Sequence, residues 1–331
     1  MNEPSRIQSE TKIWSDWWKT QCLFKRILPL LIATAYLLFL QGFHVLRVDH
    51  YQMSFAGLLL WYLGPRLRPF FRFILPLLLV GVIYDSQRIY ADAIRGPIHV
   101  REPYDFDKYF FGINTPDGVL TPNEWWQKHT YPVLDLICGF FYLCFISIYV
   151  VLCMYLCFWL PRNGTKKKTP EWIKAQAYRP MWAFFWVNMI GYSTYYWFAA
   201  APPWYVADHG LGPADLSVAA SAAGALRFDA LLGTHFFTGM YGRAADVFGA
   251  VPSLHVAYPL QATYYAFQYG TKRVFAVCFY LCMCFSAVYL NHHYILDILW
   301  GSAYALIVCV VLDRLAKNQT AEEEKLIAAR I

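Results

Sequence analysis

The sequence predicts an all-α integral membrane protein, a polytopic bundle of six to eight transmembrane helices. Of its 331 residues, 58% are hydrophobic, 19% are aromatic and only 15% are charged. Soluble domains carry about 25% charged residues, so this chain lacks the charge needed to cover a surface that faces water. The composition argues against a soluble enzyme and a disordered chain. The net charge of +6 does not indicate a nucleic-acid binder, because the basic residues lie between apolar runs rather than in one stripe.

Apolar runs define the expected spans. A helix needs about 20 apolar residues to cross a hydrocarbon core about 30 Å thick. Seven runs qualify: 27–46, 70–90, 131–160, 181–201, 253–269, 274–291 and 294–312. A shorter run at 52–64 is either a short span or a helix in the membrane interface. Before the first span, a cluster of tryptophans beside basic residues predicts a short interfacial helix; these are Trp14, Trp17 and Trp18.

Three segments follow from these runs. Residues 1–26 form an N-terminal cytoplasmic or interfacial segment, residues 27–312 a multi-pass membrane domain, and residues 313–331 a cytoplasmic tail. The strongly basic loop 161–180 marks the cytoplasmic side. Counting 52–64 as a span gives eight spans with both termini inside, whereas an interfacial 52–64 gives seven. Either count places the 202–251 loop on the non-cytoplasmic side.

Two polar motifs interrupt the apolar runs on that side. One is Gly249-Ala-Val-Pro252-Ser253-Leu254-His255, and the other is Asn291-His292-His293-Tyr294-Ile295-Leu296-Asp297. Polar residues beside membrane spans are costly and mark functional sites. The first motif puts a histidine in the opening turn of a helix, where backbone amides and the helix dipole favour a bound phosphate. In the second motif, His293 and Asp297 are four residues apart and share a helix face.

A carboxylate beside one imidazole nitrogen fixes the tautomer and leaves the other nitrogen free to attack or to accept a proton. Each of these residues taken alone is most often a solvated or hydrogen-bonded side chain. Two histidines and one aspartate at two helix starts on one face favour catalysis instead. Ser253 lacks the sharp strand-to-helix turn of a serine nucleophile, so we expect it to cap the helix or to bind phosphate.

The PSLH and HHYxxD motifs resemble those of the type 2 phosphatidic acid phosphatase superfamily. The HHYILD form and the long aromatic upstream region are most similar to its inositol phosphorylceramide synthase branch. The resemblance covers roughly residues 70–312 and implies a six-helix lipid-phosphatase-like core in a catalytic membrane domain. It also implies His293 as the nucleophile, Asp297 as the group that orients it, and His255 as the general acid and base.

The chain departs from the hydrolases of that superfamily. They carry an arginine six residues before the nucleophilic histidine, where this chain has Ala287. Their upstream Lys-x6-Arg-Pro motif is also missing, because Arg179-Pro180 has Trp172 at the lysine position and lies on the predicted cytoplasmic side. Other cations must therefore meet the phosphate. Arg243 is the first candidate and Arg88 the second, although Arg88 and Asp85 could equally form a structural ion pair.

The remaining expectations concern the surroundings of the motifs. Arg227 is a third cation candidate, and His292, Ser253 and Trp204 are candidates for the phosphate or headgroup pocket. The long 91–130 segment contains an amphipathic aromatic stretch, 104–111, expected to cover the site from the membrane surface. No metal or cofactor is predicted, since a histidine supplies the nucleophile. The nine cysteines lie mostly inside apolar runs and predict no disulfide framework.

The resemblance implies a transferase that moves phosphoinositol from phosphatidylinositol to ceramide and releases diacylglycerol. Both partners are then membrane lipids, and an accessory membrane subunit is left open. The alternative is a lipid phosphate or pyrophosphate phosphatase with the same three residues and water as the acceptor. A non-enzymatic transporter or scaffold is a third hypothesis, but the polar groups gather at one face instead of spacing through the membrane. The expected location is a Golgi or bacterial plasma membrane, with the site on the lumenal or periplasmic face.

Overall fold

The computed structural model describes residues 13–166, 168–242 and 246–328. The chain divides into two compact units, Met1–Ile83 and Tyr84–Ile331. In the first unit, residues 13–20 are helical, and α2 (Leu23–Gly42) packs against α3 (Val48–Tyr62). The indole Nε1 of Trp14 donates to the Tyr62 carbonyl at 2.9 Å. The helix α4 (Arg68–Ile94) continues from the first unit into the second.

The second unit holds the rest of the chain and both polar motifs. Its elements in order are α5 (Arg101–Phe111), β1 (Ile113–Thr115), β2 (Gly118–Leu120), α6 (Pro122–Lys128), α7 (Pro132–Met154), a π-helical turn (Tyr155–Trp159), α8 (Leu160–Asn163), α9 (Pro170–Gln176), α10 (Arg179–Trp197), α11 (Pro203–His209), a 3₁₀ turn (Ala223–Ala225), α12 (Leu226–Leu232), α13 (Phe236–Tyr241), α14 (Leu254–Tyr269), α15 (Arg273–Tyr289) and α16 (Ile295–Ala328).

All eight apolar runs form helices, so the predicted helical membrane architecture is confirmed. Among the described residues, four helices are long and apolar enough to cross a membrane: Leu23–Gly42, Arg68–Ile94, Pro132–Asn163 and Ile295–Asn318. The helix Arg273–Tyr289 is apolar but shorter. The helices α3 and α14 are also short, and α10 carries many hydroxyl groups.

The centre of the second unit is α14, which packs against α7, α10, α15 and α16. Small residues allow this close approach. A Cβ atom added at Gly301 of α16 would collide with the Ser253 backbone, and one added at Gly191 of α10 would lie 2.9 Å from the Leu254 side chain. The two glycines therefore hold the start of α14 tightly between its neighbours.

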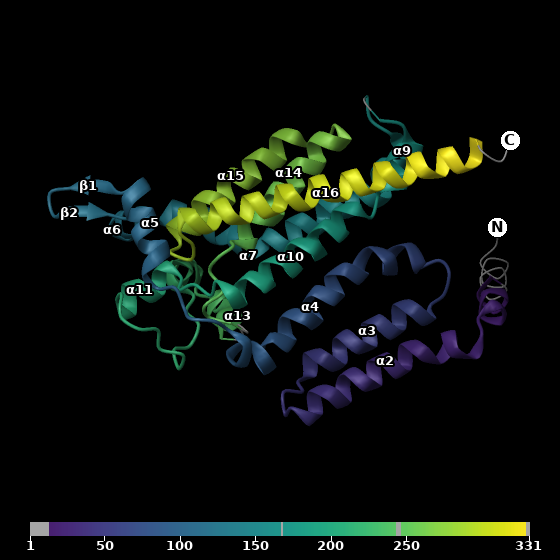
Figure 1. Ribbon diagram of the computed structural model, residues 1–331, viewed down its shortest axis with the longest axis horizontal. Helices are drawn as coiled ribbons and strands as arrows, with labels where there is room; N and C mark the ends of the chain where they lie inside the picture. The colour runs from purple at the N-terminus through teal and green to yellow at the C-terminus, as the bar shows by residue number, and fades with distance from the viewer. Residues whose placement is uncertain (1–12, 167, 243–245, 329–331) are drawn as a thin grey trace. The chain divides into compact units, whose positions relative to one another are not determined.

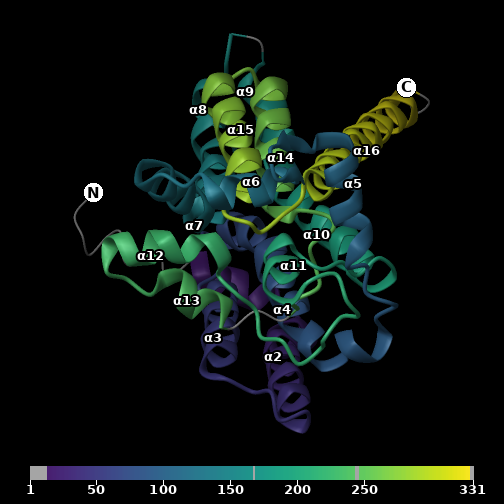
Figure 2. The same ribbon diagram turned by 90° about the vertical axis from the view of Figure 1, so that its left-hand side faces the viewer.

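Short elements gather at one end of this bundle. Figure 1 shows α5, α6, the two strands and α11 near the start of α16, whereas α9 lies at the opposite end. Figure 2 looks onto the crowded end and shows α12 and α13 beside α11.

The antiparallel hairpin β1–β2 was not predicted. Its signal is the turn Pro116-Asp117-Gly118, in which Gly118 has φ +117°, a conformation that favours glycine.

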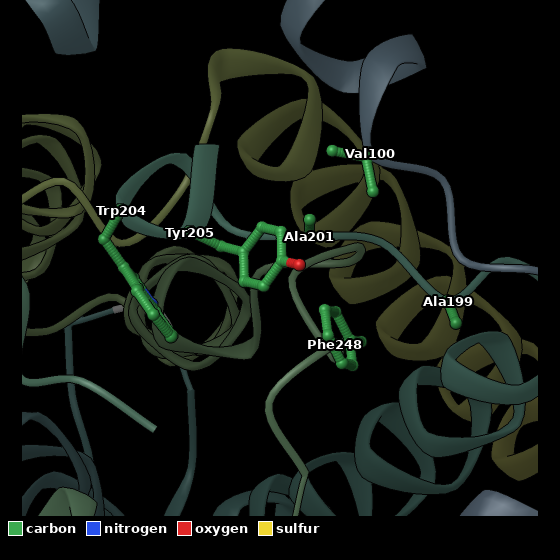
Figure 3. Close-up of a cluster of buried hydrophobic side chains, with 6 residues drawn as sticks. All are labelled: Val100, Ala199, Ala201, Trp204, Tyr205 and Phe248. Atoms are coloured by element: carbon green, nitrogen blue, oxygen red, sulfur yellow. The ribbon is translucent and has the colours of Figure 1, made fainter. Parts of the chain in front are cut away.

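Three extended segments meet beneath the first motif. Ala200 bridges to His99 on one side and to Gly249 on the other, both in parallel. A cluster of buried apolar side chains packs around these segments: Val100, Ala199, Ala201, Trp204, Tyr205 and Phe248. Figure 3 shows the Tyr205 ring between Trp204 and Phe248. This cluster and the bridging backbone fix the course of residues 248–251, directly before α14.

Candidate active site

The second motif follows a sharp turn at the end of α15. Asn291 has φ +62°, the left-handed conformation that asparagine tolerates and that commonly ends helices. The backbone amides of His292 and His293 both donate to the Ala287 carbonyl at 3.1 Å. Ala287, which stands where the hydrolases carry an arginine, is buried, and its carbonyl closes this turn.

The structure brings the three predicted catalytic residues together. The Nε2 atom of His293 lies 3.1 Å from Nδ1 of His255. On the other side of its ring, Nδ1 of His293 lies 3.2 Å from Oδ2 of Asp297 and 3.1 Å from the Ala250 carbonyl. His255 and Asp297 lie in the first turns of α14 and α16, whereas His293 lies in the turn before α16. His293 and Asp297 therefore do not share a helix face as predicted, although their side chains meet.

These contacts indicate which nitrogen of His293 carries the proton. Both partners of Nδ1 are hydrogen-bond acceptors, so Nδ1 carries the proton in a neutral ring. The other nitrogen, Nε2, then holds a lone pair, and the proton between the two rings belongs to Nδ1 of His255. The pair thus presents a nucleophilic nitrogen beside a proton donor, which is the combination needed for nucleophilic attack with general acid catalysis.

Asp297 is completely buried and helps to start α16. Its Oδ2 accepts the Tyr294 amide at 2.9 Å, so it acts at the third helical position as a capping carboxylate. Its backbone carbonyl accepts the Ser253 amide at 2.9 Å and thereby links the two motifs. Among the described residues, Oδ1 of Asp297 and Oγ of Ser253 are buried without a hydrogen-bond partner. The expected capping bond from the Ser253 hydroxyl is not formed.

Aromatic rings stack on His255 and His292. The Tyr142 ring stacks on His255 at 4.3 Å between centroids and on His292 at 5.1 Å. Tyr241 stacks on His292 at 4.7 Å. Nε2 of His292 contacts the Ala222 carbonyl at 3.1 Å, and burial lowers the pKa of His292 to about 3. His292 is therefore neutral at physiological pH and supplies no charge to a phosphate.

Sequence analysis did not identify two polar side chains that hold the second motif. Asp107 of α5 is fully buried, and its carboxylate accepts the amides of Ile295 and Leu296 at 2.7 and 3.0 Å. Asn123 of α6 donates to the carbonyls of Val288 and His293 at 3.1 and 3.0 Å. The 91–130 segment thus contacts the second motif through hydrogen bonds. The amphipathic stretch was visible in the sequence, but the partners of its aspartate were not.

The predicted cations occupy different places. Arg243 lies outside the described residues. Nε and Nη2 of Arg88 lie 3.0 and 2.9 Å from Oδ1 of Asp85, so the ion pair exists. Arg227 binds Asp135 at 2.6 Å, and it also donates to Gln127 and to the Tyr289 carbonyl.

Trp204 belongs to the buried cluster of Figure 3 and is 5% exposed. Its backbone amide donates to the Asn291 carbonyl at 3.1 Å. This bond ties α11 to the turn that carries His292 and His293. A headgroup contact by its indole stays a prediction.

Comparisons of the sequence with known proteins identify the family of the chain. A family model described as the PAP2 superfamily matches residues 119–311. A phosphoinositol dihydroceramide synthase of Bacteroides thetaiotaomicron is 33% identical over 290 residues, which are 86% of this chain and 90% of that protein. The inositol phosphorylceramide synthase catalytic subunit of Schizosaccharomyces pombe is 28% identical over 72% of this chain and 53% of its own length. An inositol phosphorylceramide synthase of Candida albicans is 34% identical over 38% of this chain and 27% of its own length. No solved structure matches the chain.

Asp107 gives the stability of the protein a specific pH dependence. Burial, opposed by the two amide hydrogen bonds, raises its pKa from 3.8 to about 7. The folded state therefore holds a proton that the unfolded state releases near pH 4, and stability is lost as the pH rises from about 4 to about 7. In the wild type, the free energy of unfolding should fall by an amount on the order of 2–4 kcal/mol over this pH range, and Asp107→Asn should remove this fall. Thermal unfolding at several pH values measures the difference between the two proteins, and parallel stability curves would contradict the assignment.

Proposed function

Because this chain belongs to the PAP2 superfamily, we propose that it transfers phosphoinositol from phosphatidylinositol to ceramide and releases diacylglycerol. The contact between Nε2 of His293 and Nδ1 of His255 carries the proposal of a histidine nucleophile. The bacterial and fungal relatives, whose names designate synthases of inositol phosphorylceramides, support transfer to a lipid over transfer to water.

The first half of the proposed reaction forms a phosphohistidine. The lone pair of Nε2 of His293 attacks phosphorus, the bond between phosphorus and the diacylglycerol oxygen breaks, and the imidazolium form of His255 gives a proton to that oxygen and becomes neutral. Asp297 and the Ala250 carbonyl hold the proton on Nδ1 and stabilise the positive charge that develops on the ring. Phosphate entry replaces the hydrogen bond between the two rings, because the attacked phosphorus must lie about 3 Å from Nε2.

The second half releases the product. His255 removes the proton from the primary hydroxyl of the acceptor, the acceptor oxygen attacks phosphorus, and the bond between phosphorus and Nε2 breaks. The first half leaves His255 neutral, which is the form that acts as the base in the second half. The second half restores its imidazolium form. A lipid acceptor must reach the phosphohistidine before water does. The buried aromatic rings of Tyr142 and Phe145 against His255 favour an apolar acceptor.

We propose that the site faces the non-cytoplasmic side of the membrane. The basic loop 161–180, with α9, lies at the end of the second unit opposite to α5 and α11 (Figure 1). Short loops rich in lysine and arginine stay cytoplasmic, so the motif end is directed to the lumen or periplasm. The fission-yeast relative is named a catalytic subunit, and an accessory subunit for this chain stays an open alternative.

One assay on the purified protein in mixed micelles tests the transfer. Phosphatidylinositol labelled in the inositol ring is offered with and without ceramide, and the label is followed. We expect a new lipid that requires ceramide. His293→Ala should abolish it, and Asp297→Asn should lower the rate by about 10³- to 10⁴-fold because an amide can stabilise the wrong imidazole tautomer.

His235→Ala, at an exposed histidine between α12 and α13, is the matched control and should leave the rate unchanged. Water-soluble label independent of ceramide would make the protein a hydrolase. An unchanged rate in His293→Ala would remove that residue from the mechanism.

We further propose that Arg243 is the main cation for the donor phosphate, with Arg88 second because Asp85 already neutralises it. A charge-assisted hydrogen bond lost from the bound state costs about 1.5–3 kcal/mol. Arg243→Gln should therefore lower kcat/KM for phosphatidylinositol by about 10- to 100-fold, and Arg88→Gln by less. A larger loss in Arg88→Gln would reverse this order.

A further inference from the structure

A buried ion pair lies where α4 ends and the first motif begins. Nη2 of Arg95 lies 3.0 Å from Oδ1 of Asp246, and the two side chains are 6% and 3% exposed. The Arg95 guanidinium also lies over the Phe248 ring at 5.5 Å. Nη2 of Arg95 also lies 2.9 Å from Oδ1 of Asp92, a second carboxylate whose side chain is 79% exposed. Arg95 thus has one buried partner and one at the surface.

Each member of the buried pair has an unused polar atom. Nε of Arg95 and Oδ2 of Asp246 are buried and have no hydrogen-bond partner among the described residues. Buried polar groups in native proteins are nearly always paired, so two in one ion pair require an explanation. Burial also raises the pKa of Asp246 in spite of the neighbouring Arg95, which means that the carboxylate is incompletely compensated. A ligand that bonds both atoms would remove this cost.

The same face of α4 offers another unpaired group. Arg95 donates its backbone amide to the Ala91 carbonyl at 2.9 Å and so continues the helical pattern. Gln87 lies two turns earlier on that face. Its side chain is completely buried, and neither amide atom has a partner among the described residues. This face therefore carries further hydrogen-bonding capacity beyond the ion pair.

The pair is close to the reacting histidines along a short and rigid path. Oδ1 of Asp246 accepts the Phe248 amide at 2.9 Å, and the Phe248 carbonyl accepts the Ala200 amide at 2.8 Å. Two residues further on, the Ala250 carbonyl contacts Nδ1 of His293 at 3.1 Å. The four peptide units from Asp246 to Ala250 span no more than about 14 Å when extended.

We propose that Arg95 and Asp246 form the subsite that recognises the hydroxyl groups of a neutral polyol headgroup on the donor lipid. A hydroxyl both donates and accepts, so adjacent hydroxyls satisfy Oδ2 of Asp246 and Nε of Arg95 together. A pair without net charge offers little to a phosphate or to an ammonium headgroup. The proposal rests on the proposed function, because the polyol it binds there is the inositol ring.

Binding of water-soluble headgroups to the detergent-solubilised full chain tests this subsite. Isothermal titration compares myo-inositol 1-phosphate with phosphoethanolamine, which share the phosphate, whereas the first carries hydroxyl groups and the second an ammonium group. The wild type should prefer the inositol compound. Asp246→Asn and Arg95→Lys should lower that preference by about 10- to 100-fold and leave the affinity for phosphoethanolamine unchanged. Arg95→Lys keeps a positive charge beside Asp246 but removes the guanidinium with its Nε donor, so it tests hydrogen bonding to the headgroup without leaving the buried carboxylate unpaired.

Asp92→Asn is the matched control, because it removes the exposed partner of the same guanidinium and should keep the preference. Retained preference in both test variants would overturn the subsite. Equal loss of affinity for both compounds, with a lowered unfolding temperature, would make the pair purely structural. A wild type that favours phosphoethanolamine would instead contradict the inositol donor of the proposed function.

Discussion

The hydrogen bond between Nδ1 of His293 and Oδ2 of Asp297 is the interaction on which the site depends. It lies inside the protein at the start of α16, where a buried carboxylate is tolerable because backbone amides and the helix dipole compensate its charge. One of these amides belongs to Tyr294. Because Nδ1 donates its proton to Asp297 and Ala250, Nε2 is the nitrogen that faces His255. The fold thus leaves Nε2 as the nitrogen available for the proposed attack before any substrate is bound.

Most of the surrounding structure keeps that bond in place. The left-handed Asn291 ends α15, and Asn123 holds the carbonyl of His293 itself. Gly301 lets α16 approach the Ser253 backbone closely, which allows the Asp297 carbonyl to bond the Ser253 amide. Asp107 adds a second buried carboxylate at the same helix start. The two amide hydrogen bonds of Asp107 fix α5 against the start of α16.

The sequence predicted the features that depend on local pattern. Apolar runs located the helices, and the spacing of His293 and Asp297 indicated that their side chains would meet because four residues make about one helical turn. They do meet, although His293 lies before α16 and not on its face. Features that depend on contacts between distant segments were out of reach. Nothing near Asp107 in the sequence indicates that its partners are the amides of Ile295 and Leu296, and the Arg95–Asp246 pair joins segments with unrelated patterns. The hairpin was missed although Pro116-Asp117-Gly118 is a turn signal.

The most direct test of the account is the identity of the nitrogen that carries phosphorus. The wild-type protein is incubated with phosphatidylinositol in the absence of ceramide, so that no lipid acceptor completes the second half-reaction, and is quenched under alkaline conditions. Mass spectrometry then locates the adduct, and heteronuclear NMR of the ¹⁵N-histidine-labelled protein identifies the nitrogen. The account predicts phosphoinositol on Nε2 of His293, since Nδ1 is held by Asp297 and Ala250. An adduct on Nδ1, or on His292, would contradict it.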